Sequence, residues 1–401
     1  MPRRVVVTGL GIISSIGKNI NETLESLINL KSGIGEISVL KTNHRGLIPA
    51  GEIKLSNEEL SEICGLGNQK YLTRTALLGT IAAREAFFSS GAEPGDNNDS
   101  RTGVISSTTV GGMDKTEQYF NDFLLSDRYL PYVFTHDCCD NTEKIAENLG
   151  IKGYLTTIST ACSSSANAIM FGARLIRFGH ADRIIAGGTD ALSKFTVNGF
   201  STLKILDEKP CRPFNKDRNG LNLGEGAGFI ILEAEEHAVR SKKKIFCEIT
   251  GYANANDAYH QTASSPDGYG PYLAMKQALY RSGIRPDGID YINVHGTGTD
   301  NNDLTEGLAI EKIFAPRIPP VSSTKAYTGH TLAAAGAIEA IISILAIENG
   351  ILFPNLNFTE KMDELGFDPQ IKLVKDVPVK NVLTNSFGFG GNDTSLIFSK
   401  Y

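Results

Sequence analysis

The sequence predicts an α/β fold made of two halves of similar architecture. Short apolar runs with the character of buried strands alternate along the chain with longer helical segments, which is the pattern of sheets covered by helices. The same order of segments occurs twice in the chain. Glycine is abundant, at 41 of 401 residues, and tryptophan is absent, which fits an α/β enzyme with many tight turns.

Each predicted element has a local signature. Segments 4–9, 102–107 and 182–188 are short and rich in Val and Ile, as buried strands are. Segments 74–91 and 166–179 are long enough for helices, and the first of them ends at a glycine, which commonly terminates a helix. Because such strands are apolar on both faces, we expect helices on either side of the sheet.

The internal repeat consists of four pairs of segments that occur in the same order. The pairs are 4–11 with 246–253, 82–94 with 274–286, 157–179 with 320–350, and 224–234 with 388–400. The junction falls in a charged stretch near residue 243, so we divide the chain into halves 1–243 and 244–401. Loops that correspond in the two halves would collect reactive residues at one site. Cys162 corresponds in this way to the segment that holds Lys325 and His330.

Composition and charge exclude several classes of function. The formal net charge is −6, so we expect no binding to nucleic acid or to an anionic membrane surface. We expect no membrane-spanning stretch either, and the apolar start of the chain is interrupted by glycines, as in a first strand that leads into a turn. Six scattered cysteines without a CxxC pair argue against a disulfide scaffold or a zinc site and favour the reducing cytoplasm.

Cys162 is the candidate nucleophile. It follows the predicted strand 155–160 and precedes a helix, so its thiol would lie at a helix N-terminus, where free N–H groups and the helix dipole favour a thiolate. Its small neighbours leave room for a substrate. The alternative is an inert buried thiol, since free cysteine is among the most buried residue types. For Cys138 and Cys139, which follow His136, ordinary loop thiols are favoured over a metal cluster.

The second half supplies the other candidate side chains. His295 follows the apolar stretch 290–294 and so emerges at the carboxyl end of a strand, where α/β sites usually form. Lys325 and His330 share one loop before a helix of small residues. Glu339 is a lone charge within that helix, and Lys325 is a candidate partner for it. The alternative for His295 is a loop histidine whose hydrogen bonds are satisfied. The alternative for Lys325 is a solvated surface lysine, and that for Glu339 is a carboxylate at a solvent-facing edge.

Two glycine-rich turns admit a functional and a structural interpretation. Residues 8–14 follow a strand but lack the third glycine of the dinucleotide-binding fingerprint, so a tight turn is favoured there. The glycines around Phe389 in segment 385–393 would let backbone N–H groups approach a reacting oxygen, with a tight turn before the last strand as the alternative.

Together these motifs resemble the β-ketoacyl-[acyl carrier protein] synthases, most closely the elongating Cys-His-His type, synthase II. The resemblance rests on TACSSS, RPFNKDRNGLNLGEGAG, HGTGT, STKAYTGH and NSFGFGG in this order, and it runs over essentially the whole chain. It implies the thiolase-like five-layer α-β-α-β-α fold of two similar halves. Three related families match less well. Initiating synthases have a Cys-His-Asn set, whereas His330 stands at the third position here, and thiolases have a second cysteine in the segment where Phe389 lies. Chain-length factors lack the nucleophile, which is present here as Cys162.

The resemblance implies a 3-oxoacyl-[acyl carrier protein] synthase, an acyltransferase of fatty-acid or related polyene or polyketide chain elongation. An acyl group would be held as a thioester on Cys162 and would undergo decarboxylative Claisen condensation with a malonyl carrier. The enolate would accept hydrogen bonds from His295 and His330, and the backbone N–H groups of Cys162 and Phe389 would hold the oxyanion. Neither a metal nor an organic cofactor is expected.

Supporting roles follow from the same resemblance. Lys325 is expected to position the His330 loop, with Glu339 as its ionic partner. Thr297 and Thr299 are expected to bind the pantetheine amides, and Val110 is expected to line the acyl pocket, with Phe389 as its gate. Asp303 and Glu306 are expected to fix the loop after His295. The residues expected to contact the acidic carrier protein are Lys70, Arg74 and Lys204. One departure is Asp393, which stands where the family more often has asparagine.

The implied partners are the acyl-loaded and malonyl-loaded carrier proteins and a second chain. A homodimer is expected, with a heterodimer as the alternative. The competing functions are a non-catalytic or chain-length-shaping partner subunit and a degradative thiolase acting on CoA thioesters. The joint presence of Cys162, His295, Lys325 and His330 argues against the partner subunit, and malonyl-dependent carbon–carbon bond formation would separate a synthase from a thiolase.

Overall fold

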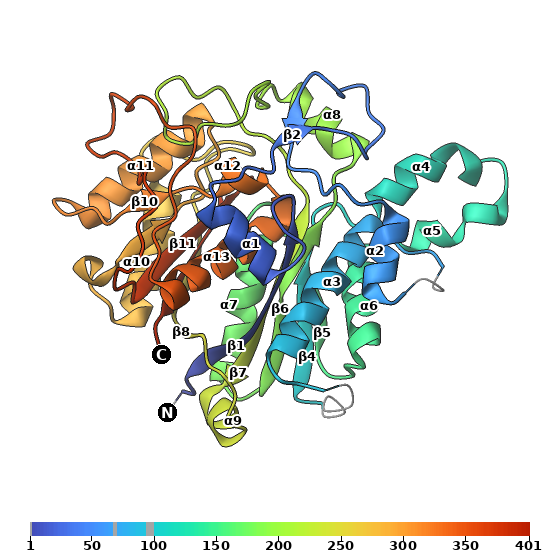
Figure 1. The fold of residues 1–401 in the computed structure, drawn as a ribbon, viewed down its shortest axis with the longest axis horizontal. Coiled ribbons are helices and arrows are strands. Elements are labelled where there is room, and N and C mark those ends of the chain that lie inside the picture. Colours follow the sequence, from blue (N-terminus) through green and yellow to red (C-terminus); the bar gives the residue numbers. More distant parts are fainter. Residues whose placement is uncertain (1, 67–69, 94–99) are drawn as a thin grey trace.

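The computed structural model describes residues 2–66, 70–93 and 100–401, and its centre is a ten-stranded sheet with helices on both sides (Figure 1). The strands run in the order β10-β9-β11-β12-β8-β1-β7-β6-β4-β5. The first half supplies β1 (Val5–Ser14), β4 (Thr102–Ser107), β5 (Leu155–Ile158), β6 (Arg183–Asp190) and β7 (Gly226–Ala234). The second half supplies β8 (Cys247–Asn256), β9 (Tyr291–Asn293), β10 (Val321–Ser322), β11 (Asn381–Gly388) and β12 (Asn392–Ser399). A separate small sheet pairs β2 (Gly35–Glu36) with β3 (Pro49–Ala50).

The two sets of five strands match position by position. In the first half β1, β7, β6, β4 and β5 are neighbours in that order, and in the second half β8, β12, β11, β9 and β10 are. The pairings also match, because the first three strands of each set are antiparallel and the rest are parallel. The sets meet where β1 pairs with β8 through Val6–Glu248 and Val7–Cys247 alone. This arrangement supports the repeat inferred from the sequence, while the division at residue 243 stays an interpretation.

Four long helices repeat the same correspondence. They are α3 (Arg74–Ser89) and α7 (Ser164–Arg177) in the first half, and α10 (Tyr269–Ser282) and α13 (Ala335–Asn349) in the second. Helices α3 and α10 cover the outer faces of their strand sets, whereas α7 and α13 pack against each other and against strands of both halves (Figure 1). Their contact is close because Gly336 faces Ala166, whose side chain would lie 2.9 Å from a Cβ at residue 336.

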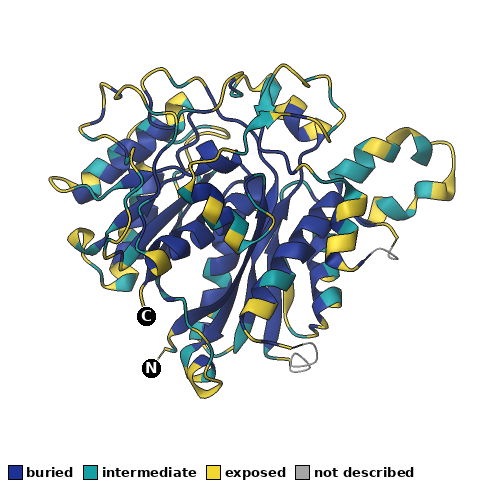
Figure 2. Cartoon of the chain, in the orientation of Figure 1, coloured by how far each residue is buried: buried dark blue, intermediate teal, exposed yellow. Residues whose placement is uncertain are grey.

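Helix α13 forms the centre of the core, and the interior around it is dark blue in Figure 2. Residues Leu332–Asn349 are apolar enough and long enough to cross a membrane, which differs from the expectation that no such stretch exists. Within the fold 89% of this stretch is buried, as in the core helix of a folded protein. A helix that is apolar all round needs burial on every side, and the two strand sets provide it.

The remaining helices lie around this core. They are α1 (Ile20–Ile28), α2 (Asn57–Cys64), α4 (Met113–Phe123), α5 (Pro131–Phe134), α6 (Cys139–Leu149), α8 (Lys194–Thr202), α9 (Glu235–Arg240), α11 (Asp300–Phe314) and α12 (Lys325–Thr328), with short 3₁₀ turns at Asp127–Tyr129, Pro286–Gly288 and Leu332–Ala334. Helices α4 and α5 form an arm that projects from the body (Figure 1). The arm exposes a series of large apolar side chains: Phe120, Leu124, Leu125, Leu130, Val133 and Phe134.

Candidate active site

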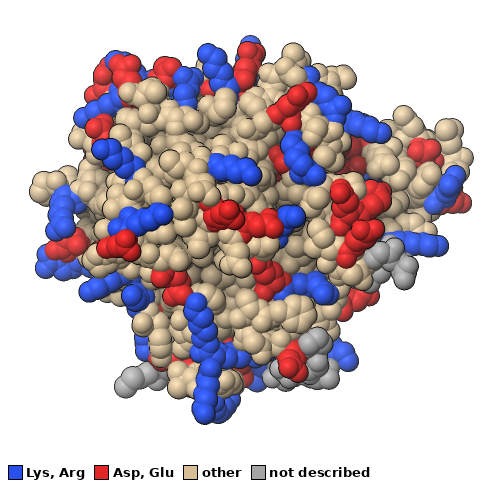
Figure 3. All heavy atoms as spheres, in the orientation of Figure 1, with Lys and Arg blue, Asp and Glu red and all other residues tan. Residues whose placement is uncertain are grey.

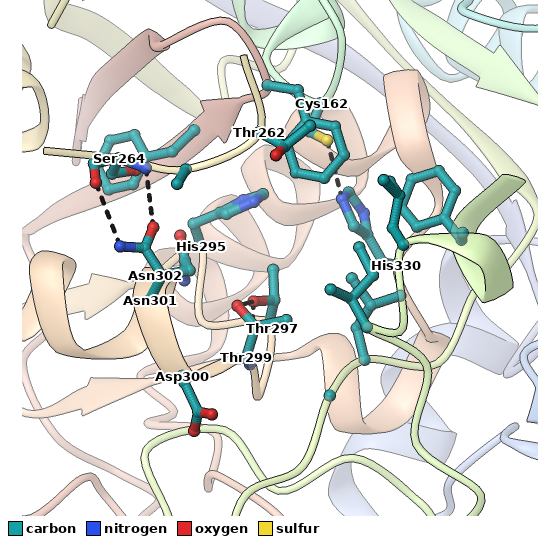
Figure 4. Close-up of a pocket in the computed structure, with 18 of the residues that line it drawn as sticks. Cys162, Thr262, Ser264, His295, Thr297, Thr299, Asp300, Asn301, Asn302 and His330 are labelled. Atoms are coloured by element: carbon teal, nitrogen blue, oxygen red, sulfur yellow. Dashed lines mark hydrogen bonds between the residues drawn. The ribbon is translucent and has the colours of Figure 1, made fainter. Parts of the chain in front are cut away.

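Cys162 lies in the turn between β5 and α7, as the sequence predicts. The chain turns sharply at Ala161, whose φ of 52° is in the left-handed region that a non-glycine residue seldom occupies. This turn directs the Cys162 thiol to a buried position, 6% exposed, where Sγ lies 3.0 Å from Nε2 of His330 (Figure 4). The first and the second half of the chain therefore meet at this sulfur.

The two histidines and the cysteine line one cavity of about 300 Å³. The rings of His295 and His330 are 5.3 Å apart between centroids and nearly perpendicular, at 85°. One ring nitrogen of each histidine and Cys162 Sγ all lie within 4.8 Å of one another. A thiolate and two imidazoles at this spacing are able to hold a soft divalent metal ion. No other group of this kind occurs in the described part of the chain, and the absence of a functional metal stays a prediction.

Hydrogen bonds determine where each histidine carries its proton. The Lys325 ammonium lies 3.2 Å from Nδ1 of His295 and has only protons to offer. The backbone N–H of Leu332 donates to Nδ1 of His330 at 3.3 Å. Burial, reinforced by the nearby charge of Lys325, lowers the pKa of both rings well below 6.5. Both histidines are therefore neutral, and in each the proton on Nε2 faces the cavity.

Lys325 is buried, with 1% of its surface exposed. It donates to the backbone carbonyl of His295 at 2.6 Å and pairs with the carboxylate of Glu339. Burial raises the pKa of Glu339 to about 7, although the Lys325 charge opposes this shift. The alternatives of a solvated lysine and a solvent-facing carboxylate are thus excluded, and the expected ion pair is present.

The ionisation of Cys162 differs from the expectation. Burial raises the pKa of its thiol to about 11. The Lys325 charge and the backbone N–H groups of Phe389 and of Cys162 itself act in the opposite direction, but they do not outweigh the loss of solvent. The backbone N–H groups thus favour the thiolate, as expected from the sequence, but burial outweighs them and the thiol is the resting form at neutral pH.

The loop after His295 is held by two buried carboxylates. Glu306 accepts hydrogen bonds from the backbone N–H groups of His295, at 2.9 Å, and Gly296, at 2.8 Å. Asp303 accepts from Thr297 N–H at 2.9 Å and also from the next residue. These contacts are those expected of residues that fix the loop. Burial raises the pKa of Glu306 to about 7, and the backbone N–H groups oppose the shift.

Thr297 and Thr299 lie on the cavity wall, and their hydroxyls are 2.9 Å apart (Figure 4). Phe389 also lines the cavity, and its ring stacks on that of Phe200 with 5.9 Å between centroids and 18° between planes. Phe200, on α8, was not singled out by the sequence analysis. It stands in an ordinary amphipathic helix, and nothing in the local sequence marks it as a neighbour of a residue far along the chain.

Val110 does not line this cavity. It is half-buried and packs among Leu192, Val197 and their apolar neighbours. Its backbone N–H donates at 3.2 Å to the buried carboxylate of Asp190, which also accepts from Ala333 N–H at 2.8 Å. Asp190 thus joins the Val110 loop to the segment after His330. Asp190 was not predicted as a site residue, although a polar side chain at the end of an apolar strand was a usable signal.

The three basic residues assigned to the carrier protein are not brought together. Lys204 is exposed at the mouth of the cavity, and Lys70 is exposed in a separate surface hollow with Lys115 and Arg128. Arg74 is 6% exposed and pairs with Glu225 at 2.6 Å. The prediction for Arg74 is wrong because the first turn of α3 lies in the interior. On the face shown in Figure 3, basic and acidic side chains are interspersed.

Comparisons with known proteins agree with this geometry. Residues 2–238 match the model of the beta-ketoacyl synthase N-terminal domain, and residues 246–359 match that of the C-terminal domain. The 3-oxoacyl-[acyl-carrier-protein] synthase 2 of Staphylococcus aureus (strain N315) is 33% identical over 413 residues, covering 100% of this chain and 99% of its own.

Two solved structures show the same fold over the whole chain. The ishigamide ketosynthase/chain length factor has a TM-score of 0.94 at 31% identity, with 100% of both chains covered. A type II polyketide synthase acyl-carrier protein in complex with its ketosynthase has a TM-score of 0.88 at 28% identity, also with 100% of both chains covered. With Cys162, His295 and His330 assembled around one cavity, the chain belongs to the β-ketoacyl synthase family and is a condensing acyltransferase of the synthase II type.

Proposed function

We propose that the cavity transfers an acyl group from a carrier protein to Cys162 and then condenses it with a malonyl group on a second carrier, in fatty-acid or polyene or polyketide chain elongation. The observation that carries this proposal is the convergence of one thiol and two neutral imidazoles within 4.8 Å. A nucleophile that stores the acyl group and two N–H donors that face the same space are the groups that this reaction needs.

In the first half-reaction the Cys162 sulfur attacks the thioester carbonyl. The new carbon–sulfur bond forms as the carrier thiolate leaves, and the proton lost by the Cys162 thiol ends on the carrier thiol. The backbone N–H groups of Cys162 and Phe389 both face the sulfur, so they are placed to hold the oxyanion of the tetrahedral intermediate. Because the pKa of Cys162 is raised, the thiol loses its proton only as the substrate binds, and His330 Nε2–H then stabilises the sulfur charge.

In the second half-reaction the malonyl group loses carbon dioxide, and its electron pair passes into an enolate. The enolate oxygen accepts hydrogen bonds from Nε2 of His295 and Nε2 of His330. The carbanion attacks the thioester on Cys162, so that a carbon–carbon bond forms, the carbon–sulfur bond breaks, and the sulfur takes up a proton from solvent. The product is a 3-oxoacyl thioester on the carrier. Neutral rings suit this step, since negative charge appears only as the reaction proceeds.

The remaining assignments support these steps. Lys325 is proposed to position the His330 loop, as the resemblance implies, and also His295, whose Nδ1 and backbone carbonyl it contacts. Thr297 and Thr299 line the cavity that holds the reacting groups, and we propose that they bind the amides of a pantetheine arm. Phe389, stacked on Phe200, is placed as a gate to the space for the acyl chain. Val110 is proposed to reach that space from the apolar cluster on the other side.

The proposed partners are carrier proteins and a second chain. Lys204 at the mouth is the basic residue best placed for an acidic carrier, and Lys70 is proposed as a contact outside it.

The apolar arm and β5, which is the edge strand of the sheet, form a surface suited to a second copy. We propose a homodimer in the cytoplasm, with a chain-length-factor-like subunit as the alternative partner. Light scattering after size-exclusion chromatography should give a molar mass twice that of the chain. Leu125→Glu should reduce this molar mass to that of a single chain.

Intact mass spectrometry tests the function directly. The protein is incubated with a panel of acyl carriers of different chain length, and a covalent acyl adduct is expected that is absent from Cys162→Ala. The chain length of the strongest adduct identifies the substrate. The expected second result is a 3-oxoacyl carrier when a malonyl carrier is added. No adduct with any donor would indicate a non-catalytic partner subunit, and an adduct formed only from CoA thioesters without malonyl condensation would indicate a thiolase.

A further inference from the structure

Three asparagine side chains form a polar cluster behind the Cys162 turn. Asn167 lies in α7, Asn254 in β8 and Asn392 at the start of β12, so both halves of the chain contribute. We call them the asparagine cluster. None of the three lines the substrate cavity, and the reaction described above gives them no part. Buried and half-buried amides that hydrogen-bond so extensively usually fix a specific arrangement of the chain.

The oxygen of Asn392 is the centre of the cluster. Asn392 Oδ1 accepts hydrogen bonds from Ser163 Oγ at 2.7 Å, from Asn254 Nδ2 at 2.7 Å and from Asn167 Nδ2 at 2.9 Å. The Asn167 amide nitrogen also donates to Thr160 Oγ1 at 2.9 Å. One acceptor atom thus ties together helix α7, strand β8 and the turn that carries the nucleophile.

The cluster connects the two residues that supply the oxyanion N–H groups. Ser163 directly follows Cys162, and Asn392 lies three residues after Phe389 in the same hairpin. The contact between hairpin and turn leaves no space for a side chain, since a Cβ at Gly388 would lie 2.8 Å from the Thr160 carbonyl oxygen and 3.2 Å from the Cys162 backbone nitrogen. A shift of the hairpin relative to the turn would therefore change the separation of the two N–H groups directly.

We propose that Asn392 is a positioning residue for acyl transfer, which holds the Phe389 N–H in place against the Cys162 N–H. The proposal rests on the function proposed above. Oxyanion donors act only at hydrogen-bond distance from the developing charge, so a displacement of about 1 Å is enough to lower the rate strongly. Asn392 acts through the hairpin backbone and does not touch the substrate. It should therefore affect the half-reaction that uses the oxyanion site, and leave decarboxylation at His295 and His330 unchanged.

The test measures the two half-reactions separately. Acylation is the rate at which Cys162 acquires the acyl group, and Asn392→Ala is expected to lower it by about 10- to 100-fold. Decarboxylation of a malonyl carrier is measured in the Cys162→Ala background, where adding Asn392→Ala is expected to leave the rate unchanged. Asn392→Thr keeps one acceptor oxygen, so its acylation rate should lie between those of the wild type and Asn392→Ala.

The matched control is Ser399→Ala, which lies on the same strand and loses a hydroxyl contact of 2.8 Å with Thr250, away from the active site. It should leave acylation unchanged. Parallel loss of both half-reactions in Asn392→Ala would show a merely structural role and overturn the proposal, as would unchanged acylation. If Asn392→Ala does not fold, wild-type acylation by Asn392→Thr overturns the proposal and a reduced rate with intact decarboxylation supports it. A wild-type protein that forms no acyl adduct would instead refute the proposed function.

Discussion

Lys325 and Glu339 form an ion pair next to His295, and neither side chain is more than 3% exposed. The same ammonium approaches Nδ1 of His295 and donates to that residue's backbone carbonyl. A buried charge is tolerated only where it is paired. Glu339 therefore compensates the buried Lys325 ammonium, and this ammonium beside Nδ1 leaves the ring proton of His295 on Nε2.

Removal of one member of this pair should destabilise the fold as well as the reaction. Glu339→Leu leaves an uncompensated buried ammonium and is expected to lower the free energy of unfolding by about 3–5 kcal/mol. Chemical denaturation measures this change. The control is Lys144→Ala, which breaks a surface pair with Glu147 and should cost less than about 1 kcal/mol. Equal effects of the two substitutions would contradict the buried-pair interpretation.

The raised pKa of Cys162 predicts how its reactivity depends on pH. Because the pKa is about 11, the thiolate fraction at neutral pH is small, and the rate of alkylation by iodoacetamide should rise about tenfold per pH unit between about pH 7 and about pH 10. Modification of Cys162 is followed by peptide mass, which distinguishes it from the more exposed Cys138 and Cys139. A rate that reaches a plateau below about pH 8 would indicate the resting thiolate that the sequence alone suggested.

Neutral histidines predict a decarboxylation rate that does not vary with pH in the neutral range. Burial and the Lys325 charge lower the pKa of His295 and His330 well below 6.5, so neither ring gains a proton between about pH 6 and about pH 9. The rate for a malonyl carrier, measured in Cys162→Ala, should be flat over this window. His295→Ala and His330→Ala should each reduce it by about 100-fold or more. An acid limb with a midpoint near 6.5 would mean that a histidine titrates there.

The sequence was sufficient for the reactive residues because each stands at the end of a recognisable element. Cys162 follows a strand and starts a helix, and His295 leaves the carboxyl end of a strand. The repeat identified the corresponding loops, and the fold brings them to one cavity. Lys325 and Glu339 were paired correctly because a lone charge in an apolar helix needs a nearby partner.

What sequence reasoning missed depends on contacts between distant segments. The ionisation of Cys162 is decided by burial rather than by its helix, and burial is a property of the packed halves. Arg74 was assigned to the surface that contacts the carrier protein, but Glu225, 151 residues away, holds it in the interior. The hydrogen bonds from Ser163 and Asn254 to Asn392 likewise join segments that no local pattern connects.

Asp393 predicts a stability that falls as the pH rises. This residue, where the family more often has asparagine, is fully buried, and neither carboxylate oxygen has a hydrogen-bond partner among the residues that the structure describes. Gly270 lies against it, since a Cβ there would be 2.1 Å from Oδ2. Burial, together with the charges of Asp257 and Glu306, raises the pKa of Asp393 to about 9. The folded protein thus keeps this carboxyl protonated.

The sign of the effect follows from proton linkage. Below the usual aspartate pKa of about 4, Asp393 is protonated in both the folded and the unfolded chain and changes nothing. Between about pH 4 and about pH 9 only the unfolded chain releases the proton, so each pH unit lowers the free energy of unfolding by up to about 1.4 kcal/mol. Asp393→Asn removes this dependence and should raise the melting temperature more at pH 8 than at pH 5. Asp368→Asn, on the surface, should change neither value. If Asp393→Asn shifts the melting temperature equally at the two pH values, then Asp393 is ionised in the folded protein and a partner must satisfy its charge.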